Sequence, residues 1–154
     1  MAIEIERKYL VIGEGWKNAP SIQMIQAYLS RDKSRTVRVR VAGDKAFLTI
    51  KGENHGATRA EFEYEVPLLD ARSMITMCEG PVINKTRYKV NYEGFTWEVD
   101  VFADDNEGLV IAEIELRSED EVFPVPDWIG AEVTGDPKYY NSSLISFPFQ
   151  EWQK

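Results

Sequence analysis

The sequence predicts a β-dominated α+β fold, in which eight antiparallel strands close into a barrel with a polar interior. Three observations lead to this prediction: apolar and charged residues alternate, charges of one sign gather on each strand, and short turns separate the strands. The alternation has a period of two, which is typical of half-buried strands. The segments that show it are residues 3–11, 35–43, 45–52, 58–66, 83–92, 96–102 and 111–118, with a shorter eighth at 25–30.

Short connections join these strands into one expected domain, residues 1–154. Residues 42–45 and 92–94 are typical of hairpin turns, so neighbouring strands should run antiparallel. Eight strands are enough to close a barrel, and closure removes the exposed edges of the sheet. If the charged faces point inward, the apolar faces lie outside the barrel and need helices to cover them.

Three segments carry helix signals that suit this role. The first has Asp70 as its expected N-cap and ends before Gly80. The second begins with a capping box from Ser118 to Glu121. The third, expected to close the barrel, has Asp136 as N-cap and proline at its first helical position.

The net charge of −8 argues against a nucleic-acid partner or an anionic membrane surface, because both are polyanions. No stretch approaches the roughly 20 apolar residues of a membrane span, and the N-terminus is a charged strand rather than a signal peptide. Cys78 is the single cysteine, so no internal disulfide can form. These features favour the cytoplasm and leave the oligomeric state open, with a homodimer possible.

The charges are sorted by strand in a way that a solvated sheet face does not require. Neighbours on one face of a strand stand about 6.7 Å apart, where like charges repel by roughly 2 kcal/mol at an effective dielectric of about 20. A plain antiparallel sheet with one wet face is the alternative, but it would mix both signs. We therefore expect a charged concavity whose carboxylates hold Mg²⁺ or Mn²⁺ and whose basic groups hold a polyanion with phosphate oxygens.

The N-terminal strand, Glu4-Ile5-Glu6-Arg7-Lys8, resembles the ExExK signature of the CYTH superfamily, also called the triphosphate tunnel metalloenzymes. The later charged strands follow in the family's order, and "VTGDPKYYNSSL" is similar to its closing segment. The resemblance covers nearly the whole chain and points to the short, single-domain bacterial branch. It implies an eight-stranded tunnel in which a divalent metal assists chemistry on a small-molecule triphosphate.

The resemblance also assigns roles to residues of this chain. The metal ligands it implies are Glu4, Glu6, Asp100, Glu113 and Glu115. Possible supporting carboxylates are Glu61, Glu63 and Glu98, although Glu63 and Glu98 could instead form salt bridges to tunnel arginines. The implied catalytic phosphate-binding set is Lys8, Arg38, Arg40, Lys51, Lys85 and Arg87. Arg59 and Lys138 join these six as substrate-binding residues, and Lys138 could otherwise be a solvated lysine at a helix end.

The function expected from this resemblance is metal-dependent hydrolysis of inorganic tripolyphosphate to pyrophosphate and phosphate. One alternative is an organic triphosphatase that acts on thiamine triphosphate or a nucleoside triphosphate, and adenylate cyclase is a weaker version of it. A non-enzymatic alternative is a protein that binds polyphosphate or triphosphate without turnover. A lipid-binding barrel of the lipocalin kind would need an apolar inner face, which the charged positions disfavour.

Overall fold

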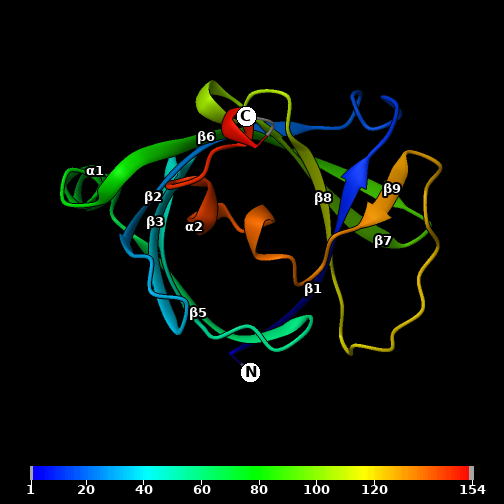
Figure 1. The fold of residues 1–154 in the computed structure, drawn as a ribbon, viewed down its shortest axis with the longest axis horizontal. Helices are drawn as coiled ribbons and strands as arrows, with labels where there is room; N and C mark the ends of the chain where they lie inside the picture. The colour runs from blue at the N-terminus through cyan, green and yellow to red at the C-terminus, as the bar shows by residue number, and fades with distance from the viewer. Residues whose placement is uncertain (1, 153–154) are drawn as a thin grey trace.

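The computed structural model describes residues 2–152, and in this part of the chain eight antiparallel strands close into a ring (Figure 1). Neighbours around the ring follow the order β5-β4-β3-β2-β6-β7-β8-β1, and β1 also pairs with β5. The strands are β1 (Ile3–Val11), β2 (Ser21–Ser30), β3 (Arg35–Ala42), β4 (Lys45–Gly52), β5 (Thr58–Val66), β6 (Glu79–Tyr92), β7 (Phe95–Phe102) and β8 (Val110–Glu115). The predicted closed barrel is confirmed.

Strand β1 closes the ring by dividing one of its edges between two partners. Its first half pairs with β5, where Glu4 lies opposite Arg59. Its second half pairs on that edge with β9 (Ile129–Glu132), a short strand that the sequence reading did not anticipate. The other edge pairs with β8, where Glu6 lies opposite Glu115. The first strand of the chain is therefore held by segments from three later parts of the sequence.

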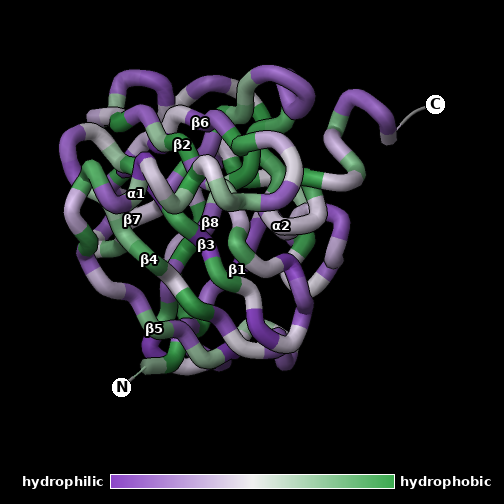
Figure 2. Tube along the Cα trace, turned by 90° about the vertical axis from the view of Figure 1, so that its left-hand side faces the viewer, coloured by the Kyte–Doolittle hydropathy of each residue, from purple (hydrophilic) through white to green (hydrophobic). Residues whose placement is uncertain are grey.

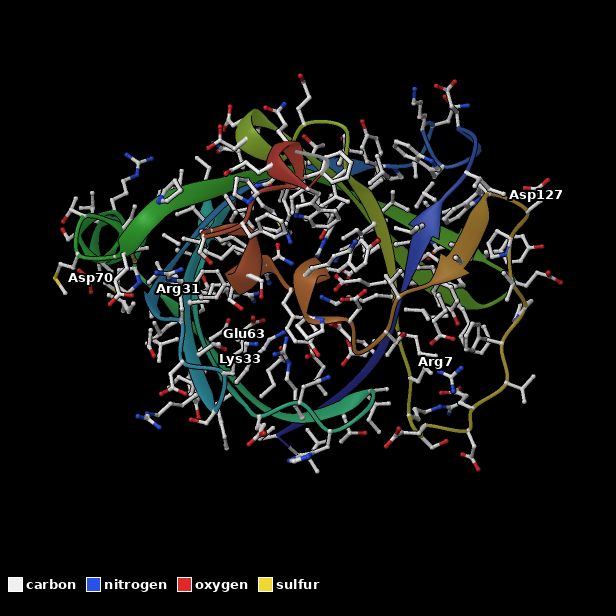
Figure 3. The ribbon with its side chains drawn as sticks, viewed as in Figure 1. Arg7, Arg31, Lys33, Glu63, Asp70 and Asp127 are labelled. Carbon is white, nitrogen blue, oxygen red and sulfur yellow. The ribbon has the colours of Figure 1, made fainter. Side chains whose placement is uncertain are left out.

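Apolar and charged residues alternate along the strands, as the tube in Figure 2 shows. Odd-numbered residues of β1 face outward: Tyr9 belongs to an outer core with Trp16, Trp97 and Trp128. Arg7, on the same outer face, extends away from the ring, whereas Glu63 of β5 points into it (Figure 3). Because strand parity separates the faces, the charged face of the strands points into the barrel, as predicted, and isolated charges such as Arg7 lie outside.

The closing segment, residues 136–145, lies across one end of the barrel (Figures 1 and 2). It contains the 3₁₀ helix η2 (Pro137–Tyr139) and the helix α2 (Asn141–Leu144). At this end the strands turn apolar on their inner faces, and these side chains pack against the segment. The cluster comprises Tyr28, Ile83, Phe102, Leu109, Ile111, Tyr139, Leu144 and Ile145. Apolar packing therefore closes this end of the tunnel.

The remaining helices are shorter than the sequence suggested. Helix α1 (Leu68–Ile75) begins after Pro67, so Asp70 lies inside its first turn instead of capping it. The prediction of a helix beginning at Ser118 is wrong. This stretch is a turn in which the Glu121 carboxylate accepts a hydrogen bond from the Arg117 backbone N–H. Two further 3₁₀ turns, η1 (Asp104–Asn106) and η3 (Phe149–Glu151), complete the described elements.

Helix α1 covers only part of the outer face of β3 and β4, against Val39 and Ala46. Phe62 and Tyr64 of β5 remain exposed on the same outer surface. The expectation that helices cover the outer apolar faces is thus met only in part. Among residues 2–152, no helix has the length and apolar character needed to span a membrane.

Candidate active site

A cavity of about 400 Å³ occupies the interior of the barrel. Its walls are charged because the inward positions of seven strands, all but β2, carry acidic or basic side chains. The predicted site residues that line it are Glu4, Glu6, Lys8, Arg38, Arg40, Lys51, Arg59, Glu61, Glu63, Lys85, Arg87, Glu98, Glu113 and Glu115. The structure thus brings together fourteen of the sixteen predicted residues around one space, and the other two, Asp100 and Lys138, do not line it.

The deep wall of the cavity is a network of mutually neutralised charges on β6, β7 and β8. Asp100, which is 1% exposed, accepts from Lys85 Nζ at 2.8 Å and from Arg87 Nε at 2.7 Å. Arg87 also reaches Glu113 at 3.2 Å and Glu98 at 3.4 Å. Burial alone would raise the pKa of Asp100, but Arg87 and Lys85 hold it below its usual value. Each nitrogen of the Arg87 guanidinium therefore lies near a carboxylate.

A second pairing neutralises the carboxylate nearest the N-terminus. Glu4 accepts hydrogen bonds from Lys51 Nζ at 3.1 Å and from Arg59 Nε at 3.3 Å. Burial works to raise the pKa of Glu4, but Lys51 and Arg59 outweigh it and bring the pKa to about 2. Lys8 pairs with Glu113 at 3.4 Å on the neighbouring strand. These carboxylates stay ionised at neutral pH.

The two arginines of β3, Arg38 and Arg40, are held much more loosely. Within residues 2–152, the one carboxylate that both approach is that of Glu63, at 3.4 Å and 3.5 Å, and its side chain is 34% exposed. Arg38 also donates to Thr49 Oγ1 at 3.2 Å. The Nε atoms of both arginines are buried, and no group in the described part of the chain accepts a hydrogen bond from them. Burial, together with the charges of Arg38 and Arg87, lowers the pKa of Arg40 to about 10. These guanidiniums retain donors that an anion in the cavity could satisfy.

Carboxyl groups without a basic partner among residues 2–152 lie on the opposite side, on β1 and β8. Glu6 and Glu115 are direct cross-strand partners, and neither forms an ion pair within residues 2–152. Burial raises the pKa of Glu6 to about 8, and the charges of Glu113 and Glu4 add to this effect. Burial and neighbouring carboxylates also raise the pKa of Glu115. A cation beside Glu6 and Glu115 would relieve this repulsion.

These oxygen donors fit a hard divalent cation better than a soft metal. Within the described part of the chain, however, no three acidic, histidine or cysteine side chains converge closely enough to enclose an ion. Ions such as Mg²⁺ commonly bind through one or two carboxylates, with water and substrate phosphates completing the shell. The pair Glu6 and Glu115 suits that mode, in which the metal and the anion bind together.

Asp100 and Lys138 occupy different places. Asp100 lies behind Lys85 and Arg87, with both carboxylate oxygens bound to them. Lys138 is exposed, with its ammonium 4.5 Å from the centre of the Trp152 ring. The expected N-cap at Asp136 is present, because its carboxylate accepts from the Lys138 backbone N–H.

Several cavity residues were absent from the predicted site: Tyr28, Thr36, Lys45, Asn141 and Ser142. Strand parity offered a signal for two of them. Thr36 shares a face with Arg38 and Arg40, and Lys45 shares one with Lys51. Asn141 and Ser142 had no such signal, because their position depends on where the closing segment docks.

The barrel and its cavity define a class of protein: a closed polar tunnel that can hold a phosphate-rich anion and a divalent cation. The model of the CYTH domain family matches residues 2–142, and this chain belongs to that family. Metal dependence is expected for the family.

Two relatives are called inorganic triphosphatase. The one from Acetivibrio thermocellus is 51% identical over 156 residues, covering 100% of each chain. The one from Nitrosomonas europaea is 35% identical and covers 94% of this chain and 99% of its own. A crystal structure of an inorganic triphosphatase has a TM-score of 0.68 and 34% identity, covering 94% of this chain and 99% of that one. A putative adenylyl cyclase from Hippeastrum, 13% identical with a TM-score of 0.58, shares the fold over 77% of this chain and 80% of its own.

Proposed function

We propose that this protein hydrolyses inorganic tripolyphosphate to pyrophosphate and phosphate. The observation that carries the proposal is the division of charge across the cavity. Loosely held guanidiniums of Arg38 and Arg40 lie on one wall, and the unpaired carboxylates of Glu6 and Glu115 lie on another. A triphosphate that brings its own divalent cation would satisfy both groups at once. The two relatives called inorganic triphosphatase support the same reaction.

In this proposal Arg38 and Arg40 bind phosphate oxygens directly, while Lys8 and Lys51 supply positive charge from β1 and β4. Lys85 and Arg87 act from the deep wall, with their orientation fixed by Asp100. Glu6 and Glu115 would hold Mg²⁺ or Mn²⁺, supported by Glu4, Glu113 and, farther out, the carboxylates of Glu61, Glu63 and Glu98. The bound metal would neutralise developing negative charge and lower the pKa of a bound water. The remaining requirement is to align the triphosphate for in-line attack, which the cationic walls meet.

The test measures phosphate release from tripolyphosphate, ATP and thiamine triphosphate, each with Mg²⁺, with Mn²⁺ and with EDTA. We expect metal-dependent release, fastest from tripolyphosphate, and a large loss in Glu6→Gln. The control is Glu65→Gln, because Glu65 is an exposed residue of β5 that does not line the cavity. Faster release from ATP or thiamine triphosphate would overturn the inorganic substrate. Binding of tripolyphosphate without any turnover would instead favour a binding protein.

We further propose a cytoplasmic location, which the single cysteine in the sequence supports. A homodimer also remains a proposal. Light scattering on the purified chain would distinguish a mass near 17.7 kDa from twice that value.

A further inference from the structure

The closing segment spans the barrel opening between opposite walls. On one side, the Tyr140 ring lies 5.3 Å from Lys8 Nζ and 5.8 Å from the guanidinium of Arg59, on β1 and β5. On the other side, the next residue, Asn141, contacts β2 and β6. Two strands separate these pairs of walls in either direction around the ring. Asn141 therefore lies where the closing segment meets the deep wall of the cavity.

The orientation of the Asn141 amide is set by its neighbours. Lys85 Nζ lies 3.1 Å from Asn141 Oδ1, and an ammonium can only donate, so the oxygen must face Lys85. Gln26 must then present its own nitrogen, and Nε2 donates to the same oxygen at 2.9 Å. This leaves Gln26 Oε1 without a donor among residues 2–152, in a residue that is 0% exposed. Such an unpaired acceptor is costly, so the orientation is maintained against a local penalty.

Asn141 Oδ1 accepts both of these hydrogen bonds, so the side-chain NH₂ group of Asn141 is available as a donor. Asn141 lines the cavity, and among residues 2–152 no group accepts a hydrogen bond from Nδ2. We propose that Asn141 is a substrate-contacting residue whose Nδ2 donates a hydrogen bond to a phosphate oxygen at the deep end of the cavity. This inference rests on the proposed function. The amide would add a directional donor without adding positive charge beside Lys85 and Arg87.

Two variants separate this contact from a purely structural role. Asn141→Asp keeps an oxygen for Lys85 and Gln26 but removes the donor, whereas Asn141→Ala removes both. We expect each variant to bind tripolyphosphate at least about tenfold more weakly in isothermal titration calorimetry, as is usual when one hydrogen bond to a charged group is lost. Ser143→Ala is the matched control, since Ser143 is in the same helix and does not line the cavity.

Each other pattern would overturn the proposal. Weak binding by Asn141→Ala alone would mean that Asn141 only anchors the closing segment. Weak binding by Asn141→Asp alone would mean that the new charge repels the anion. If Asn141→Ala does not fold, the affinity ratio of wild type to Asn141→Asp is compared at low and high salt. Salt screens repulsion, so a ratio that falls to one overturns the contact, and a ratio that stays constant supports it.

The titrations are run in EDTA, which stops the proposed metal-dependent reaction, so the heat reports binding alone and separates this inference from the proposed reaction. A wild-type protein that binds tripolyphosphate but fails to hydrolyse it would contradict the proposed function, while the Asn141 contact would still be tested. Hydrolysis by all variants with unchanged affinity would contradict the contact alone.

Discussion

The basic residues of β3 and β6 line the same cavity but differ in the number and distance of the carboxylates that neutralise them. On β6, Arg87 has carboxylates at 2.7 Å, 3.2 Å and 3.4 Å, from three different side chains. On β3, Arg38 and Arg40 share one carboxylate at 3.4–3.5 Å. The comparison teaches that arginines on two strands separated only by β2 differ in how fully neighbouring carboxylates compensate their charge. Carboxylates within the fold neutralise the cations of β6, whereas the arginines of β3 keep donors that we propose a ligand satisfies.

The acidic residues of β1 show the same contrast within three positions. The pKa of Glu4, paired with Lys51 and Arg59, falls to about 2 even though burial opposes this. The pKa of Glu6 rises to about 8 through burial and the nearby charges of Glu113 and Glu4. Uncompensated groups of both signs thus face one another across the cavity, which is the arrangement that a metal–phosphate complex needs.

The largest expected effect comes from breaking the neutralised network. Arg87→Leu would remove the cation that Asp100, Glu113 and Glu98 share, leaving Asp100 with Lys85 and Glu113 with Lys8. Removing one partner of a buried ion pair typically costs about 3–5 kcal/mol. We expect the free energy of unfolding in urea to fall by about that amount. Lys89→Ala, on the same strand but exposed, should change it by less than about 1 kcal/mol. Equal losses in the two variants would contradict the distinction between paired and free cations.

Arg40→Ala should lower activity strongly while leaving stability almost unchanged. The long contact to a partly exposed Glu63 contributes little, so the free energy of unfolding should change by less than about 1 kcal/mol. The rate constant kcat/KM for tripolyphosphate should fall about 10- to 100-fold, because hydrogen bonds to a charged group are lost. Arg35→Ala is the control, as Arg35 is an exposed residue of β3 that pairs with Asp32. If the free energy of unfolding falls by more than about 1 kcal/mol while kcat/KM is unchanged, Arg40 stabilises the fold as Arg87 does and does not bind substrate.

The pKa of Glu6 predicts how stability depends on pH when metal is removed with EDTA. Its folded-state pKa of about 8 lies above the ordinary value of 4.5, so between these values the folded state binds the extra proton. The stabilisation that Glu6 contributes is therefore complete below pH 4.5 and is lost as pH rises through this window. We expect a loss of about 2 kcal/mol between pH 5 and pH 7 that is absent in Glu6→Gln. If the free energy of unfolding depends on pH in the same way in both proteins, a neighbouring group already neutralises the charge of Glu6.

The smallest expected effect belongs to Lys138. Its ammonium lies over Trp152 and is exposed, so a contact with bound phosphate would be screened by solvent. We expect Lys138→Ala to raise KM for tripolyphosphate about threefold with little change in kcat. No change in KM would leave Lys138 as a surface lysine of the closing segment.

Much of the fold followed from strand parity, because a period-two pattern assigns every residue to one face. The closed ring and the inward position of residues such as Glu4 and Arg38 follow from that rule. The short strand β9 and the turn at Ser118 were missed because tertiary contacts, not local pattern, decide them. The ion pairs could not be predicted from the sequence either, because they depend on the register between strands. Arg40 lies near one carboxylate and Arg87 near three for this reason.

The division of β1 between partners has a consequence for how the chain folds. Its contacts join Ile3 to Ala60, Glu6 to Glu115 and Tyr9 to Glu132, so the first strand made has only distant partners. Such high contact order slows folding, because long loops must close before these contacts form. Until β1 docks, β5 and β8 each present an unpaired edge that another chain can join. Refolding yield should therefore fall as protein concentration rises, even though the finished ring leaves those edges covered.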